Sequence, residues 1–153
     1  MVNPDTVVDL LVTQLRSISA LATTLFATNE IVGYKYDFPR AQDFIGFYEK
    51  ADPPVLLVYH RGCRTGNIAA GVRIAHEISL VWKRNGNAGE VFAAVREGVP
   101  GGTGLKWKLR QLSSDFLPPY QITFGYRPME TAARTIIDVP EMQFILAERG
   151  IDN

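Results

Sequence analysis

One cysteine and two histidines are the residues best suited to chemistry in this sequence. Cys63 is the only cysteine among 153 residues, and His60 and His76 are the only histidines. A thiol beside an imidazole can act as a nucleophile with its base, and the same side chains bind zinc. His60 and Cys63 stand three residues apart on or just past a predicted strand, so alternation is expected to place their side chains on opposite faces. His76 falls on the apolar face of the next strand, where a buried, hydrogen-bonded histidine is the usual outcome.

A glycine-rich run and a pair of carboxylates are the other patterns that could carry chemistry. The run at Gly98–Gly104 lacks the spacing of a phosphate-binding loop, because Trp107 stands where serine or threonine is required. Asp5 and Asp9 share a helix face, but acidic residues at a helix start stabilise the helix dipole. The two histidines have neither a carboxylate cluster nor a His-x-x-x-His spacing beside them. The sequence therefore predicts no catalytic residue, no metal site, no cofactor and no enzymatic activity.

The elements that position these residues follow from hydrophobic periodicity. Apolar side chains three and four residues apart predict a helix over residues 5–26. Glycines at 62, 66 and 71 predict a polar turn between two strands, which gives a long β-hairpin with a flexible, basic tip. The second strand of this hairpin alternates for twelve residues, which is typical of a strand with one exposed face. These strands are predicted over residues 31–36, 55–60 and 72–83.

The second half of the chain combines one helix with several strands. A helix is predicted over residues 88–98, with Asn87 and Glu90 forming a capping box. Pro140 separates the last two strands and predicts a sheet edge or a bulge there. Helices on one face of a mostly antiparallel sheet predict a single α+β domain over residues 1–153. The further strands are predicted over residues 105–110, 122–126, 134–138 and 141–148.

Composition and charge exclude several classes of protein. Hydrophobic residues make up 46% of the chain, which excludes intrinsic disorder, and the formal net charge of zero argues against a protein that mainly grips a phosphate backbone. The charge is uneven along the chain: residues 1–52 carry −3, residues 53–110 carry +6 and residues 111–153 carry −3. Copies of the chain could attract each other head to tail, or folding could average this field out. A single cysteine and the absence of an apolar leader favour synthesis in the cytoplasm.

Three loops are predicted to contact other chains. They are the basic hairpin tip, an aromatic loop between residues 37 and 52, and the glycine-rich loop. For each of them the alternative is an ordinary surface loop, and the aromatic loop could fold back over the core. The three together favour a component of an assembly. The candidate interface residues are Arg61, Arg64, Arg73, Phe44, Phe47, Gly101 and Gly102.

The order of elements and three segments of sequence resemble a family of tailed-phage neck proteins. A long amphipathic helix and an aromatic, proline-bearing entry precede PPVLLVYHRGCRTGN, which turns into AAGVRIAHEISLVWKR, and the chain closes with PEMQFILAERGID. Together they are similar to the tail terminator (tail completion) family of the lambda minor-tail-protein type.

This resemblance implies an α+β subunit of a hexameric ring in the virion, without enzymatic activity, cofactor or membrane contact. The ring would cap the tail tube and then dock to the head-completion or connector protein. DNA would pass through its lumen and be contacted non-specifically at most. By the same resemblance, Arg61, Arg64 and Arg73 would serve subunit or partner contacts. The alternatives are another neck component, such as a head-completion or tail tube protein, and a cytoplasmic small-molecule-binding or enzyme domain.

Overall fold

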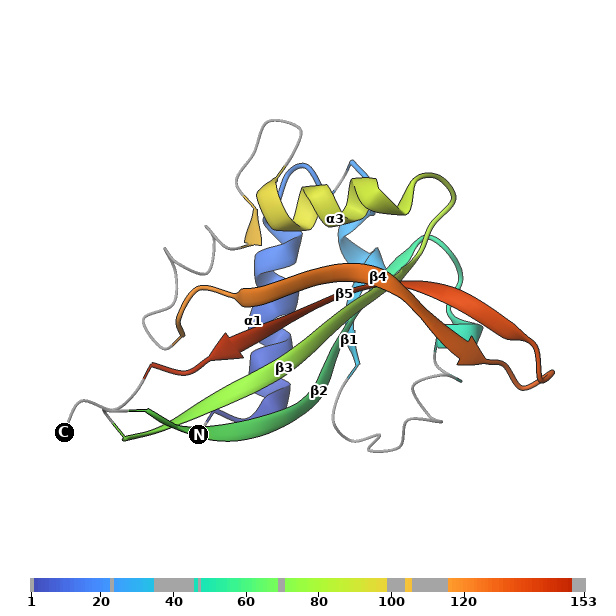
Figure 1. Ribbon diagram of the computed structural model, residues 1–153. Helices are drawn as coiled ribbons and strands as arrows, with labels where there is room; N and C mark the ends of the chain where they lie inside the picture. The colour runs from blue at the N-terminus through green and yellow to red at the C-terminus, as the bar shows by residue number, and fades with distance from the viewer. Residues whose placement is uncertain are drawn as a thin grey trace.

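A five-stranded sheet with two helices packed against it forms the centre of the protein (Figure 1). The computed structural model describes residues 2–22, 24–34, 46, 48–68, 71–98, 104–105 and 116–149. The sheet order is β1-β2-β3-β5-β4; β1 and β2 are parallel and the other neighbours are antiparallel. The predicted α+β fold and the long hairpin are therefore confirmed. The elements are α1 (Pro4–Arg16), a 3₁₀ turn (Thr28–Glu30), β1 (Ile31–Tyr34), β2 (Val55–Ile68), β3 (Gly71–Lys83), α3 (Ala88–Glu97), β4 (Tyr120–Glu130) and β5 (Ile136–Ala147).

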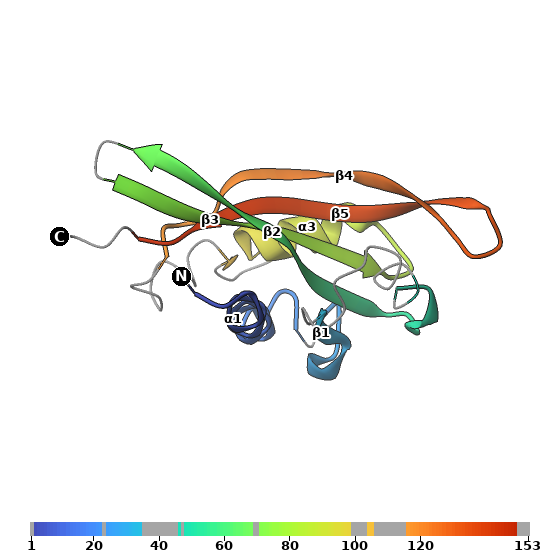
Figure 2. The same ribbon diagram turned by 90° about the horizontal axis from the view of Figure 1, so that it is seen from below.

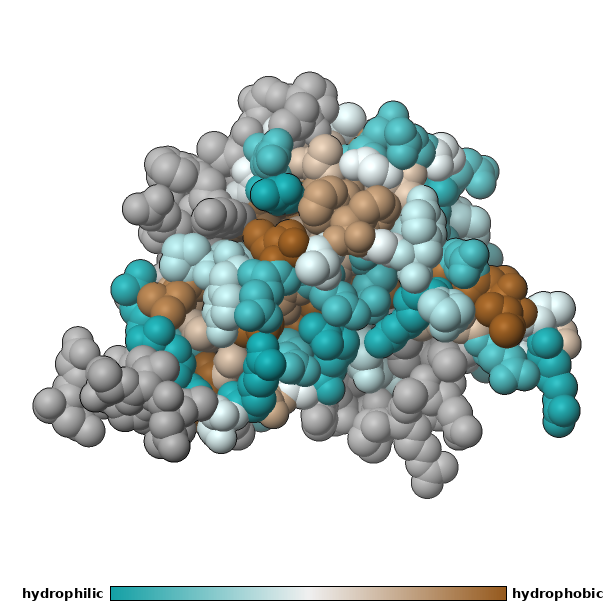
Figure 3. All heavy atoms as spheres, in the orientation of Figure 1, coloured by the Kyte–Doolittle hydropathy of each residue, from teal (hydrophilic) through white to brown (hydrophobic). Residues whose placement is uncertain are grey.

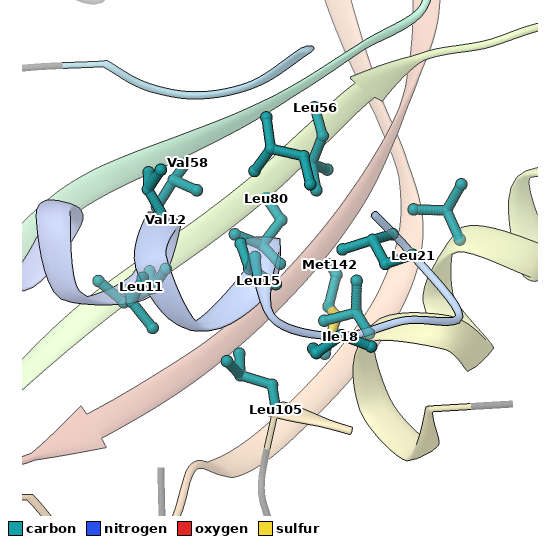
Figure 4. Close-up of a cluster of buried hydrophobic side chains, with 14 of the residues drawn as sticks. Leu11, Val12, Leu15, Ile18, Leu21, Leu56, Val58, Leu80, Leu105 and Met142 are labelled. Carbon is teal, nitrogen blue, oxygen red and sulfur yellow. The ribbon is translucent and has the colours of Figure 1, made fainter. Parts of the chain in front are cut away.

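Helix α1 lies across one face of the sheet and contributes Val7, Val8, Leu11, Val12 and Leu15 to the main core (Figures 2 and 4). Its start is well specified, because the Asn3 side chain accepts a hydrogen bond from the Asp5 amide and Pro4 occupies the first turn. Its apolar stripe packs onto alternate residues of the strands, where each contact removes a side chain from water. The labelled contacts in Figure 4 include Leu11, Val12 and Leu15 from the helix and Val58 and Leu80 from the sheet.

The predicted helix over residues 5–26 is too long, because α1 ends at Arg16. The Ser17 hydroxyl and amide both donate to the Gln14 carbonyl, which closes the last turn. The chain then continues in turns that still bury Ile18 and Leu21 completely. The helical spacing of apolar residues therefore continues beyond the last residue of the helix.

Strand β2 is eight residues longer than predicted and leaves no polar turn at residues 62–67. Residues 62–68 pair with β3 down to Ile68 opposite Gly71. The predicted flexible tip is wrong for Arg61, Arg64 and Arg73, since all three lie in the paired strands. Glycine costs strand stability but does not interrupt the hydrogen-bond ladder, so these glycines did not end the strand.

Strand β3 is buried on both faces in its middle. Its predicted apolar face is confirmed, with His76, Ile78, Leu80 and Trp82 at most 2% exposed. The prediction of an exposed second face is wrong there, because Val81 belongs to a second core cluster on that face. This cluster consists of Tyr34, Tyr48, Val55, Leu57, Val81, Met129 and Val139.

The last two predicted strands are one continuous strand, β5, which includes Pro140. Pro140 pairs with Tyr126 of β4, whereas pairing with β3 begins only at Glu141. Proline fits because β5 has a neighbour on one side only at that point, which confirms the predicted edge position. Beyond it, residues 126–130 and 136–140 form a two-stranded arm, here called the β4–β5 arm, which extends past the other strands (Figures 1 and 2).

Helix α3 agrees with its prediction, including Asn87 as its N-cap, except for the role predicted for Glu90. The Asn87 side chain accepts from the Gly89 amide, and Gly98 ends the helix with a left-handed φ of 71°. The predicted capping box is wrong, because Glu90 forms an ion pair with Arg84 instead. The strand predicted over residues 105–110 lies outside the described residues except for Leu105. Of the strand predicted over residues 31–36, the described residues 31–34 form β1.

Tyr48 gives the second core cluster a pH-dependent stability. Its hydroxyl donates to the Trp82 carbonyl oxygen over 3.2 Å, and burial raises its pKa to about 12. A raised pKa favours the neutral phenol in the folded state, so this stabilisation is complete below the unfolded pKa of about 10 and is lost as pH rises toward 12. We expect Tyr48→Phe to be about 1 kcal/mol less stable at neutral pH, because it lacks the hydrogen bond.

Between about pH 10 and pH 12 the wild-type chain should lose about 2–3 kcal/mol more unfolding free energy than Tyr48→Phe. Urea titrations of both proteins across this range measure the difference, and all other ionisations cancel between them. Parallel stability curves for the two proteins would contradict the burial of the phenol.

Candidate functional site

A cluster of Cys63, His60, His76 and Glu148 lies at the hairpin end of the sheet, on the face that carries α1. A β-bulge between His60 and Gly62 inserts Arg61 as an extra residue in β2. Each residue of a strand points to the opposite face from its neighbour, so one extra residue reverses all later side chains. Cys63 therefore lies opposite His76, on the same face as His60. The prediction that His60 and Cys63 point to opposite faces is wrong for this reason.

Three donor atoms converge within this cluster. His60 Nε2 lies 2.9 Å from His76 Nδ1, and Cys63 Sγ lies 3.4 Å from His76 Nδ1 and 3.7 Å from His60 Nε2. Both imidazoles are buried, with exposures of 2% and 0%, while Cys63 is exposed. The cluster is thus fixed in the sheet on one side and open to solvent on the other.

Glu148 completes the cluster through the outer nitrogen of His76. Its Oε2 atom lies 2.7 Å from His76 Nε2 and also accepts from the Val2 amide over 3.1 Å. The residue is placed by the Glu148 amide, which donates to the Ile74 carbonyl and continues the β3–β5 ladder by one step. Sequence reasoning missed this carboxylate, although it continues the alternation of Phe144 and Leu146 on β5.

Hydrogen bonding and burial determine the state of these groups. A carboxylate only accepts, so His76 Nε2 is the donor, and His76 Nδ1 is the nitrogen that faces His60 and Cys63. Burial, followed by the neighbouring His76, lowers the pKa of His60 to about 4, which keeps that ring neutral at neutral pH. Burial, followed by the charges of Glu148 and Glu77, raises the pKa of the Cys63 thiol.

The arrangement of the cluster suits two kinds of chemistry. A thiol, an imidazole and a carboxylate in a row form the framework of a nucleophilic cysteine. The raised pKa of Cys63 weighs against this use, since a catalytic cysteine normally has a lowered pKa. Two imidazole nitrogens and a sulfur facing one point are also a donor set for a thiophilic metal.

The arginines proposed as interface residues lie on the other face of the hairpin. Arg61 and Arg64 both approach Glu77, at 3.7 Å and 3.4 Å, and Arg73 lies opposite Gly66. The structure thus places these three arginines together in one patch. The Arg64 side chain is 52% exposed, more than the other side chains in these ion pairs. The other proposed interface residues, Phe44, Phe47, Gly101 and Gly102, lie outside the described residues.

A second candidate surface, which the sequence reasoning did not single out, is the outer edge of the sheet at β4. Strand β4 ends the sheet order, and none of the described residues pairs with its outer side. Its neighbourhood exposes Tyr120, Tyr126 and Ile136 by 40%, 59% and 73%. Figure 3 shows hydrophobic surface on the arm, at the end of the molecule away from the hairpin.

No family model matches the sequence, and no curated protein matches it either. Within the described part of the chain, no helix has the length and apolar character that crossing a bilayer requires.

Removal of the Glu148 carboxylate tests the geometry of the cluster. In Glu148→Ala the buried His76 Nε2 loses its acceptor, and we expect a loss of about 1–3 kcal/mol of unfolding free energy. The matched control is Glu77→Ala on the opposite face, where partly exposed ion pairs contribute at most about 1 kcal/mol. Urea denaturation measures both, and equal losses in the two variants would contradict the cluster.

Proposed function

We propose that this protein is a structural subunit of a tailed-phage virion, a tail terminator. Six copies form a ring that caps the tail tube and joins it to the head-side connector, and DNA passes through the lumen. Support comes from the resemblance in element order and sequence described above, and from an α+β fold of the kind that the resemblance implies.

The outer edge of β4, with which none of the described residues pairs, is the observation that carries this proposal. The strand is eleven residues long, and a long edge with exposed apolar side chains is a template for pairing with another chain. The occupant that we propose is a second copy of this chain. A contact between two different surfaces of identical subunits is heterologous, and it closes into a ring when its rotation permits.

The two ends of the molecule differ in a way that favours head-to-tail contact. The β4–β5 arm projects from one end of the sheet and the β2–β3 hairpin from the other (Figures 1 and 2). The hairpin carries Arg61, Arg64 and Arg73 against the single acidic residue Glu77, which leaves it basic. The arm carries exposed apolar surface and is close to neutral, with Glu130 and Asp138 against Arg127. Unlike surfaces at opposite ends allow each subunit to meet the next in the same orientation.

Ile136 is the residue with which the ring contact is tested. We expect Ile136→Asp to abolish the six-fold species in native mass spectrometry, because a buried charge at the contact would be desolvated. Ile136→Val is the matched control and should keep it. The side chain is 73% exposed, so both variants should retain the wild-type melting temperature.

The same measurement separates the neighbouring possibilities. A stable wild-type dimer contradicts a terminator, and long tubes in place of rings identify a tail tube protein. If the chain is monomeric by itself, the two variants are compared for binding to the ends of tail tubes of the same phage. A wild-type chain that does not bind them contradicts the proposal.

A further inference from the structure

We propose that His60 Nε2, Cys63 Sγ and His76 Nδ1 are the three protein ligands of a site for a thiophilic divalent ion, Zn²⁺ above all, with Glu148 as the positioning residue for His76. The site does not depend on the proposed role in the phage tail. It follows from donor geometry, donor chemistry and the way in which the sheet holds the three side chains.

The distances between the donor atoms fit a tetrahedral ion. Zinc–nitrogen bonds of about 2.0–2.1 Å and zinc–sulfur bonds of about 2.3 Å separate two nitrogens by about 3.3 Å, and a nitrogen from a sulfur by about 3.6 Å. The two sulfur–nitrogen distances here are 3.4 Å and 3.7 Å. The nitrogen–nitrogen distance is 2.9 Å, so the rings need to separate by only about 0.4 Å.

The hydrogen bond to Glu148 prepares His76 for this role. A metal-bound histidine usually donates its other ring N–H to a carboxylate, which fixes the tautomer and the ring orientation. The 2.7 Å contact between His76 Nε2 and Glu148 Oε2 is such a bond, and it leaves Nδ1 as the nitrogen that faces Cys63 and His60. Binding would release the Cys63 thiol proton to solvent and would place the single proton of the neutral His60 ring on Nδ1.

The fold makes the three-ligand site rigid and accessible at once. His60 and His76 lie on adjacent paired strands and are almost fully buried, while Cys63 is exposed. The β-bulge brings the thiol to the histidine face, so the site depends on the extra residue Arg61. The exposed side provides the entry path and leaves the fourth position to water or an external donor, as in zinc sites with an open position. A mixed nitrogen and sulfur set selects zinc and related ions over Mg²⁺ and Ca²⁺.

Metal titration of the full chain tests the site. The protein is prepared without a histidine tag, kept reduced, treated with a chelator and titrated with Co²⁺ and then Zn²⁺. We expect one equivalent of Co²⁺ to give the absorption of tetrahedral cobalt with a sulfur-to-metal band, and Zn²⁺ to displace it. Zn²⁺ should also raise the melting temperature of the wild-type chain, because the ion binds the folded state.

Three variants assign the ligands. Cys63→Ser changes an exposed side chain, so it should fold and lose the sulfur band together with the rise in melting temperature. Glu148→Gln should weaken Zn²⁺ binding about 10- to 100-fold, as changes in such outer-shell partners do. Glu77→Gln, on the same hairpin but the opposite face, is the matched control and should bind like the wild type.

Two results would overturn the assignment. One is a wild-type chain that takes up no stoichiometric Co²⁺ or Zn²⁺. The other is uptake that Cys63→Ser leaves unchanged, which would be adventitious binding elsewhere on the chain. In either case the cluster would be a hydrogen-bonded group that links the hairpin to β5.

Discussion

The antiparallel pairing of β2 with β3 determines where the rest of the molecule lies. In its inner half the ladder aligns Leu56 with Trp82 and Val58 with Leu80, and this produces the apolar surface that α1 covers. Gly33 in the neighbouring strand β1 allows the helix to come close, since a β-carbon there would collide with Val8. In its outer half the same ladder is shifted by one residue at Arg61, and the face that carries leucines near α1 carries His60, Cys63 and His76 instead. One register therefore defines both the core and the polar cluster.

Local patterns in the sequence were sufficient for the elements that depend on their own residues. The alternation in β3, the cap and glycine stop of α3 and the edge character of Pro140 all follow from side chains within a few positions of one another. The predictions that were wrong concern features decided by distant partners. Strand β2 continues through its glycines because β3 supplies a partner for each of Gly62 and Gly66, and Val81 is buried because Tyr48 and the arm cover it. Apolar periodicity alone does not report such coverage.

The candidate site illustrates the same limit more sharply. Three residues suited to metal or thiol chemistry were visible in the sequence, but simple alternation placed two of them, His60 and Cys63, on opposite faces. The glycine after Arg61 is a signal for a bulge, because glycine inside a strand often marks one, yet its position alone does not give the direction of the shift. Glu148 follows the last residue of β5 and is 72 positions from His76, so their contact depends on the pairing of β3 with β5. A polar cluster that joins three strands is a property of the register and not of any one segment.

The exposed edge of β4 and the polar cluster of the hairpin make the two ends of the sheet chemically different. A free strand edge is a hazard for a protein that acts alone, and such proteins shorten it or place charges on it. Here β1, at one edge, has only four residues and lies beside α1, whereas β4 at the other edge has eleven and exposes tyrosines. Arg127 pairs with Glu141 across β4 and β5, so the charge that could protect this edge is partly engaged within the sheet. The hairpin end, in contrast, is tied internally, since Glu77 holds two arginines on one face and Glu148 holds His76 and the Val2 amide on the other. In the proposed ring, the hairpin held by these contacts would be one surface of the subunit, and the edge of β4, which no described residue pairs with, would be the other.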